Sequence, residues 1–295
     1  MQSADFLSAV FFYLKVGENL NQNWIVENLN NAFSTWNGKL GELWGLVTTG
    51  PQTFKGGAVW GVMQNLHNAM VGVGYALVVL FFAISLFKNT MNFHELKRPE
   101  AALHYLIRFV AAKALVGYGM DIMLNIFSIC NDVITDMTSG MGGISQAMVS
   151  LPGEMQTAIE NVGFLASIPL WLVTILGSLF ITVLSFVMIL TVYGRFFRLY
   201  MYTALAPLPL ASFAGESTQS VGISFVKSYI GVCLEGAVIV LACIIYSAFA
   251  STPTVTGGEP TTMVWSYLAE TVFNMLVLVG LVKGSDRIIH EMMGL

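Results

Sequence analysis

The chain has 295 residues, 56% of them hydrophobic and only 10% charged, and its mean hydropathy is +0.72. Soluble domains carry roughly 25% charged residues, so this composition excludes a soluble enzyme. The net charge of −4 is spread thinly, and no basic run is longer than Lys97-Arg98. Tight nonspecific binding of nucleic acid is therefore excluded, and only local or transient contact with single-stranded DNA remains.

Long apolar runs without alternation predict the fold class, an all-α polytopic membrane bundle. Backbone N–H and C=O groups in lipid need internal partners, which only helices and closed barrels provide, and the strands of a barrel would show alternation. We therefore expect a multi-pass protein of a bacterial cytoplasmic membrane. It should have about five spanning helices, N-terminal amphipathic helices and a proline-containing cytoplasmic elbow.

The first predicted element is an amphipathic helix in an extracytoplasmic N-terminal region, residues 1–56. Apolar residues recur there at alternating steps of four and three and form one stripe: Leu29, Phe33, Trp36, Leu40, Leu43 and Val47. Trp24, Trp36 and Trp44 suit the headgroup level of a bilayer, so we expect the segment to lie on the membrane or on a partner. The alternative is that it folds back onto the bundle. Gly50-Pro51 ends this element.

A transmembrane bundle is predicted for residues 57–295, with spans near 69–87, 107–129, 165–193, 229–250 and 264–282. Pro99 suits the first turn of the second helix. No proline interrupts the pattern from Ala101 to Met137, so we expect one continuous helix that projects beyond the bilayer, which about 20 residues suffice to cross. Arg195 and Arg198 are expected to close the third span.

An apolar stretch from Leu199 to Phe213 follows, but Pro207 and Pro209 interrupt it. Proline lacks a backbone donor, and its ring clashes with the preceding helical turn. A regular crossing helix is therefore not expected here. The pattern predicts an interfacial or re-entrant elbow.

Basic residues predict the orientation, because loops rich in Lys and Arg stay in the cytoplasm. One predicted side of the bundle holds most of them: Lys88, Lys97, Arg98, Arg195, Arg198, Lys227, Lys283 and Arg287. The opposite side holds Lys15, Lys39 and Lys55. Five crossings, with the N-terminus outside and the C-terminus in the cytoplasm, satisfy every loop, and no even-numbered topology does so as well.

Ionisable residues inside a bilayer are the first functional candidates, because their burial is costly. Four of those in the predicted helices are the candidates that matter here: Arg108, Lys113, Asp121 and Glu235. One hypothesis is that they line a polar path through the assembled protein. The other is that Glu235 pairs with Arg108 or Lys113 and fastens the bundle, while long basic side chains reach the headgroups. Under both hypotheses, Glu235→Leu leaves the protein inserted but alters its function.

Enzymatic motifs are missing from the sequence, which has no Gly-x-x-x-x-Gly-Lys-Ser/Thr loop, no His-Glu-x-x-His pair and no Gly-x-Ser-x-Gly elbow. The four histidines are scattered, so we expect no catalytic residue, no cofactor and no metal. Cys130, Cys233 and Cys243 lack metal-ligand spacing, and we interpret them as small apolar packing residues. Residues 1–16 lack a basic start and a cleavage site, so we expect them to be retained.

Two stretches resemble a known family. The first is Phe-His-Glu-Leu-Lys-Arg-Pro-Glu at 93–100 with Leu-Ile-Arg-Phe-Val-Ala-Ala-Lys at 106–113. It is similar to the junction of the first two spans in VirB/TrbL-like membrane subunits of Gram-positive mobile elements. The second runs from Arg195 to Lys227, with Ala-Leu-Ala-Pro-Leu-Pro-Leu-Ala at 204–211 and then Thr218 and Phe225. It resembles the elbow before the fourth span of the wider TrbL family.

The resemblance implies a non-enzymatic channel or platform subunit of a conjugative type IV secretion system, which supports transfer of DNA and protein across the cytoplasmic membrane. The implied partners are a VirB-type ATPase, a coupling ATPase, other membrane subunits and further copies of the chain, since some members of the family assemble as rings of five copies. The elbow, with Arg195, Arg198, Pro207, Pro209 and Lys227, would contact the ATPases.

Two other classes of function remain open. A small-solute transporter would often show repeated halves and broken helices around a midplane site, whereas this chain has no evident repeat and one interrupted segment. A holin-like membrane protein is the third class, and expression that lyses the host would favour it.

Overall fold

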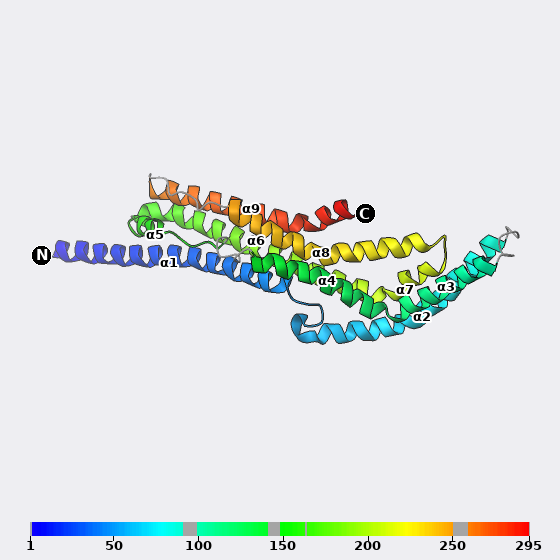
Figure 1. The fold of residues 1–295 in the computed structure, drawn as a ribbon. Helices are drawn as coiled ribbons and strands as arrows, with labels where there is room; N and C mark the ends of the chain where they lie inside the picture. The colour runs from blue at the N-terminus through cyan, green and yellow to red at the C-terminus, as the bar shows by residue number, and fades with distance from the viewer. Residues whose placement is uncertain (1, 91–98, 141–147, 163, 250–258, 295) are drawn as a thin grey trace. The chain divides into compact units, whose positions relative to one another are not determined.

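The computed structural model describes residues 2–90, 99–140, 148–162, 164–249 and 259–294, and every regular element in these ranges is a helix (Figure 1). The long helices are α1 (Gln2–Val47), α2 (Ala58–Thr90), α3 (Pro99–Gly117), α4 (Gly119–Gly140), α6 (Phe164–Leu205), α8 (Gln219–Phe249) and α9 (Pro260–Met293). The short ones are η1 (Phe54–Gly57), α5 (Gly153–Glu160), α7 (Pro207–Leu210) and η3 (Ala211–Ala214). The predicted all-helical fold class is confirmed.

Four helical segments are long and apolar enough to cross a membrane: Phe54–Lys88, Ser167–Leu205, Gln219–Ala248 and Thr261–Met293. A fifth is present if the bent pair Leu103–Gly117 and Gly119–Ser139 is one span. Each of the five predicted spans falls on one of these segments. Several helices begin at a proline, as predicted for Pro99, because the missing N–H would have no intrahelical partner in the first turn.

The chain divides into two compact units. Unit 1 comprises Met1–Trp44, Gly142–Thr191 and Ala242–Lys283. In it α1 runs alongside α6 in the same direction, since Trp24 contacts Trp171 and Asn28 contacts Ser178 (Figure 1). The predicted apolar stripe is its core, because Leu29, Phe33, Trp36, Leu40 and Leu43 are all buried. The N-terminal helix therefore folds back onto α6, which is the second of the two alternatives.

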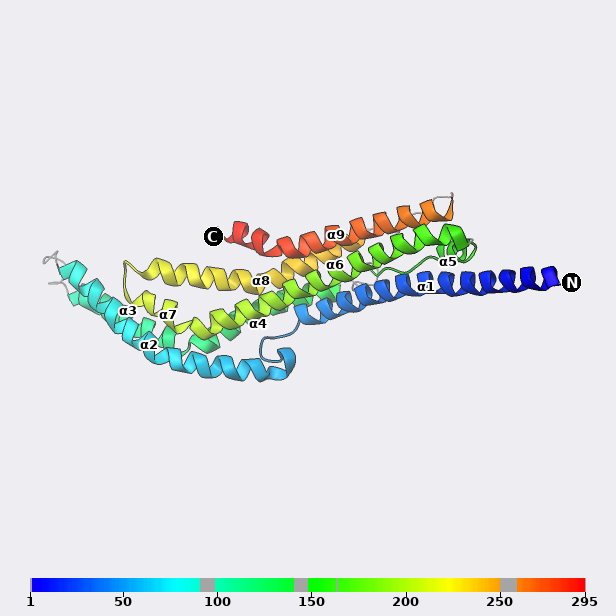
Figure 2. The same ribbon diagram turned by 180° about the vertical axis from the view of Figure 1, so that it is seen from behind.

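Unit 2 comprises Gly45–Met141, Val192–Leu241 and Gly284–Leu295. The predicted elbow is present here as α7 and η3, which follow the end of α6 and pack against α2 and α3 (Figure 2). Gly74 of α2 permits this packing, because a Cβ there would lie 2.9 Å from the Pro207 carbonyl oxygen. The predicted division at residue 56, which concerns the two sides of the membrane, stays a prediction.

The continuous helix expected from Ala101 to Met137 was wrong. The helix breaks at Tyr118, where α3 and α4 meet at a bend of 72°. Glycines flank the break and weaken a helix by about 1 kcal/mol each relative to alanine. Their missing side chains also admit neighbours, since a Cβ at Gly117 would meet the Tyr75 hydroxyl at 2.8 Å and one at Gly119 would meet Leu210 at 3.3 Å.

The helix that contains the third predicted span does not end at Arg195 and Arg198. Helix α6 continues for two further turns, to Leu205, and ends immediately before Ala206-Pro207, while the end of the membrane span itself stays a prediction. The helix ends there because proline disfavours helical geometry in the residue before it. The two arginines consequently lie inside a helix; the Arg195 side chain is buried in the interior of unit 2, and Arg198 is half-buried.

The turn that joins α1 to α2 is held in a left-handed conformation. Lys55, Gly56 and Gly57 have φ values of 52°, 74° and 78°. A Cβ at Gly57 would lie 2.9 Å from the Gln52 carbonyl oxygen, so glycine is required at that position. Phe54 is buried beside this turn and stacks on Phe196 of α6 with ring centroids 4.0 Å apart.

Candidate functional site

An ion-pair cluster around the buried Glu235 joins α6, α8 and α9 in unit 2. The Arg198 guanidinium donates to both carboxylate oxygens of Glu235 at 2.7 Å and also to the Asp286 carboxylate. The Ser285 hydroxyl donates to Glu235 at 3.3 Å. Only 1% of Glu235 is exposed. A buried carboxylate needs both a countercharge and hydrogen bonds, and here all of these come from two other helices.

Arg195 lies one turn before Arg198 and is 0% exposed. Its guanidinium donates to the carbonyl oxygens of Val232 at 3.2 Å, Cys233 at 3.0 Å and Val47 at 3.4 Å. Val47 is the last residue of α1, and the free carbonyls at a helix C-terminus attract cations. Among the described residues, no carboxylate lies within ion-pair distance of Arg195.

Gly236 creates the space for the Arg195 guanidinium. A Cβ at this position would lie 2.6 Å from Nη1 of Arg195 and 2.7 Å from Cδ1 of Ile134 in α4. The Phe127 ring, also in α4, has its centroid 6.0 Å from the guanidinium carbon. The arginine is thus enclosed by α4, α6, α8 and the end of α1, and it acts as a structural cation that links four helices.

The expected partners of Glu235 were wrong. Arg198 binds the carboxylate, whereas Arg108 and Lys113 do not, because both lie on α3. Arg108 instead donates to Gln219 at 3.1 Å and approaches Glu216 at 3.7 Å. Lys113 is exposed. The four intramembrane candidates therefore do not form one polar path inside the chain.

Asp121 belongs to a different feature, a polar ridge on α4. The residues of this ridge recur at steps of four and three, and all are exposed: Asp121, Asn125, Ser128, Asp132, Thr135 and Ser139. The neighbouring exposed positions are Ile129, Val133 and Asp136. No lysine or arginine occurs in α4. We name these six residues the α4 polar ridge, and its acidic side chains have no ion-pair partner in the described part of the chain.

The elbow residues are less accessible than a partner-binding surface requires. Pro207 is buried and Pro209 is half-buried, since α7 and η3 pack on α2 and α3. The exposed residues of this region include Glu216 and Ser217, which follow η3, and Lys227 on α8. Arg195 is buried and Arg198 is half-buried, so Glu216, Ser217 and Lys227, which we name the elbow rim, are more accessible than the prolines.

The three tryptophans proposed for a membrane interface differ in exposure. Trp24 is 42% exposed and forms a pair with Trp171, with ring centroids 5.7 Å apart, which is compatible with an interfacial position. Trp36 is 0% exposed, so its assignment as an interfacial aromatic was wrong. The reason is that it lies on the apolar stripe, which is buried in the core of unit 1. Trp44 is half-buried.

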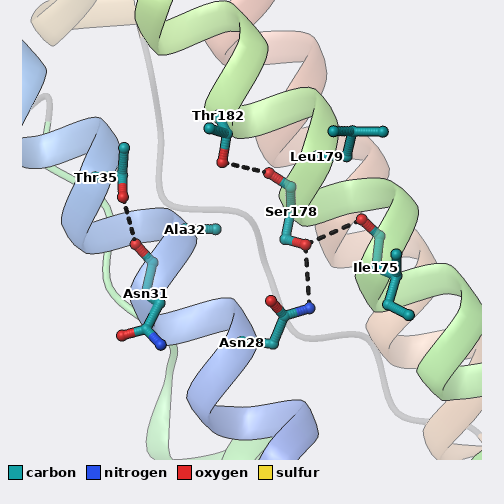
Figure 3. Close-up of a pocket in the computed structure, with 8 residues that line it drawn as sticks. All are labelled: Asn28, Asn31, Ala32, Thr35, Ile175, Ser178, Leu179 and Thr182. Carbon is teal, nitrogen blue, oxygen red and sulfur yellow. Dashed lines mark hydrogen bonds between the residues drawn. The ribbon is translucent and has the colours of Figure 1, made fainter.

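An open groove of about 350 Å³ lies between α1 and α6 in unit 1 (Figure 3). Asn28 bridges the two helices by donating to the Ser178 hydroxyl at 3.1 Å. The Thr35 and Thr182 hydroxyls donate to carbonyls of their own helices. Because its hydroxyls are satisfied locally, the groove offers little polar chemistry to a ligand, and we interpret it as a helix-packing feature.

Sequence reasoning missed Asp286, Gly236 and the α4 polar ridge. The ridge had a signal, because its steps of four and three are visible in the sequence. Asp286 and Gly236 had none, since their roles depend on which helices become neighbours. Across the described ranges, no three His, Cys, Asp or Glu side chains come together as metal ligands would.

Comparison with known proteins gives one match. A family model described as TrbL/VirB6 plasmid conjugal transfer like protein matches residues 36–207, more than half of the chain. The matched range begins in the apolar stripe of α1 and ends at the first proline of the elbow. The comparisons with curated proteins and with solved structures gave no significant match.

Proposed function

The chain belongs to the family of TrbL/VirB6 plasmid conjugal transfer like proteins, and on that premise we propose that it is a channel subunit of a conjugative type IV secretion system. Members of this family are generally non-enzymatic membrane components, and membership implies that the chain is part of a secretion system. The proposed role is to supply part of a water-filled path for DNA and protein across the cytoplasmic membrane.

The α4 polar ridge is the observation that carries this proposal. Two contacts fix the register of α4 beside α8: the Tyr229 hydroxyl donates to the Met123 carbonyl at 2.9 Å, and a Cβ at Gly236 would meet Ile134 at 2.7 Å. Residue numbers rise together along both helices, so α4 and α8 run in the same direction.

This register sets the depth of the ridge. The candidate span of α8 is Gln219–Ala248, and Cys233 lies at its middle. Cys233 lies between Tyr229 and Gly236, so the two contacts bring Ser128 and Asp132, which lie between Met123 and Ile134, close to the level at which α8 is deepest in the bilayer. A charged side chain costs several kcal/mol at that depth in lipid. The cost is avoided if the ridge faces water, and we propose that it does.

The negative charge of the α4 polar ridge suits a conduit for DNA. With aspartates and no basic residue, the surface repels phosphates and does not retain a strand by counterion release. Like charge on the wall would let a polyanion pass without sticking to it. A path of this kind requires several copies of the chain around a common axis, and we propose a homo-oligomer, with five copies as the working number taken from the family resemblance.

Cysteine accessibility tests the proposal. In a chain whose three native cysteines are replaced by serine, Asn125→Cys, Ser128→Cys and Thr135→Cys place thiols on the ridge. Leu106→Cys and Val110→Cys on the exposed apolar face of α3 are the matched controls. We expect a charged, water-soluble methanethiosulfonate to modify the ridge positions at least about tenfold faster than the controls, because lipid excludes charged reagents.

A second measurement tests whether the ridge lines the transfer path or only faces water outside it. Thr157→Cys on α5 is exposed and supplies a control outside the candidate spans. Modification with a bulky maleimide should lower conjugative transfer for Ser128→Cys and leave it unchanged for Thr157→Cys. Slow modification of the ridge, or equal transfer after both modifications, would contradict a conduit along α4.

The proposed orientation places the N-terminus outside and the C-terminus in the cytoplasm. On this arrangement the elbow rim, with Glu216 and Lys227, faces the VirB-type and coupling ATPases of a system from the Gram-positive branch. Deletion of the chain should abolish conjugative transfer, and purified protein should be oligomeric. Normal mating by the deletion strain would reject the assignment to the secretion system.

A further inference from the structure

Lys113 is a cation on an exposed apolar face of α3. Its neighbours on this face, Leu106, Ile107 and Val110, are 55%, 59% and 57% exposed, and Lys113 is exposed as well. Helix α3 belongs to the bent pair of helices that forms a candidate membrane span. A charged side chain on such a face is costly in lipid unless it finds a countercharge.

The described part of the chain does not supply this countercharge. Lys113 takes part in none of the ion pairs found there. The other cation of α3, Arg108, already has Gln219 and Glu216 as partners. We therefore looked for a carboxylate that a second copy of the chain could present to Lys113.

Asp121 is the carboxylate that matches. It is exposed on α4 and has no ion-pair partner in the ranges that the structure describes. Lys113 lies ~8 Å before the break at Tyr118 and Asp121 lies ~5 Å after it, at 1.5 Å of helix per residue. Asp132 and Asp136 lie ~21 Å and ~27 Å beyond the break. Copies arranged around an axis hold equivalent residues at one height, so Asp121 is the exposed acid of α4 that lies nearest to the level of Lys113.

We propose that Lys113 of one copy forms an ion pair with Asp121 of the neighbouring copy, and that this pair defines the contact between copies. The inference rests on the proposed function, since it specifies the interface of the homo-oligomer proposed there. Each chain uses two different surfaces, the α3 face and the start of α4, so the contact is heterologous and can close into a ring. The bend of 72° between the two helices turns these surfaces in different directions, as two separate neighbours require.

The pair is compatible with a water-filled path along α4. Asp121 is the residue of the α4 polar ridge that lies nearest to the bend. Pairing at this end of the ridge neutralises Lys113 and leaves Asp132 free to face water. The wall of the path would then keep its negative charge, and no unpaired lysine would bind phosphates there.

Charge reversal tests the pair in the full chain, purified in detergent. Lys113→Asp and Asp121→Lys each place like charges at the contact, and we expect each to lower the ratio of oligomer to monomer at least about tenfold. Gel filtration with light scattering measures this ratio. The double variant Lys113→Asp with Asp121→Lys should restore it. Lys113→Asp with Asp132→Lys is the matched control and should not restore it, because Asp132 lies at a different height.

Coexpression of the two single variants distinguishes a pair between chains from a pair within one chain. The Lys113→Asp chain and the Asp121→Lys chain carry different affinity tags. When they alternate, every contact between them joins opposite charges. We expect the two chains to copurify as an oligomer, although each is largely monomeric alone. Such assembly would also show that both variants fold.

Three outcomes would overturn the inference and leave the proposed function in place. They are an unchanged oligomer in both single variants, equal recovery by Asp132→Lys and Asp121→Lys, and failure of the coexpressed variants to assemble. A monomeric native chain would have a different meaning, because it would reject the homo-oligomer of the proposed function and the inference with it.

Discussion

The interiors of the two units differ in the kind of polar group that they bury. In unit 1 the described buried polar residues are Ser167, Thr174, Ser185 and Thr271, which all carry hydroxyls. Ser185 donates to the Ile181 carbonyl of its own helix at 2.7 Å. In unit 2 the interior contains Arg195 and Glu235, whose partners come from other helices.

This difference determines how each unit tolerates change. A hydroxyl that bonds to its own helix needs nothing from its neighbours, so apolar packing decides the stability of unit 1. A buried charge depends on a second helix in one geometry, because an unpaired charge in an apolar interior is strongly unfavourable. Unit 2 should therefore be stable in one arrangement of α6, α8 and α9 and sensitive to the loss of any partner.

The largest effect should come from Arg198→Met. This change leaves the Glu235 carboxylate buried without its ion pair, and we expect the free energy of unfolding to fall by about 3–5 kcal/mol. Denaturant titration of the protein in detergent, followed by tryptophan fluorescence, measures it. The double variant Arg198→Met with Glu235→Leu should recover most of the loss, because no buried charge remains. If the double variant is as unstable as Arg198→Met, the loss does not come from an unpaired buried charge, and the proposed difference between the two units is wrong.

Gly236→Ala should give the next largest effect. The added methyl would lie 2.6 Å from Arg195 and 2.7 Å from Ile134, and overpacking of this kind costs about 1–3 kcal/mol. Gly284→Ala in α9 is the matched control, because a Cβ there meets nothing within 4 Å. The control should be neutral or slightly stabilising, since alanine favours helix more than glycine does. Equal unfolding free energies for the two variants would show that Arg195 can move aside.

Unit 1 should accept a change of shape in its core. Leu29→Met conserves the volume of a fully buried residue, and we expect a loss of less than about 1.5 kcal/mol in the free energy of unfolding. The same titration measures it. A loss as large as that of Arg198→Met would mean that unit 1 also depends on one specific arrangement.

The smallest effect should come from Arg287→Gln. Arg287 pairs with Glu291 on the surface of α9 at 2.8 Å, and both side chains are largely exposed. Such a pair on one helix contributes only about 0.3–0.5 kcal/mol. The midpoint of the denaturant titration should therefore stay within its experimental error. A clear shift would indicate that the exposed end of α9 is ordered by a contact outside this pair.

Features that depend on one helix could be predicted from the sequence. The stripe from Leu29 to Val47 is visible because helical periodicity is a local property. The start at Pro99 and the interruption of the apolar stretch at Pro207 and Pro209 follow from the geometry of proline. For the same reason, the span regions were identified from apolar length alone.

Features that depend on neighbouring helices could not be predicted. The bend at Tyr118 needs Tyr75 and Leu210 beside the flanking glycines. The choice of Arg198 rather than Arg108 for Glu235 depends on α6 packing against α8. Arg195 looked like a residue at a membrane edge, because a sequence does not reveal that the end of α1 and two carbonyls of α8 would surround it.

The bond between Arg195 and the Val47 carbonyl has a consequence for biosynthesis. The two residues are 148 positions apart, and ribosomes add roughly 5–20 residues per second. The last turn of α1 is therefore made roughly 7–30 seconds before the cation that it binds. During that interval the nascent N-terminal segment has neither its charged partner nor the apolar surface of α6, and a translocon or chaperone must shelter Trp36 and its neighbours until α6 is inserted.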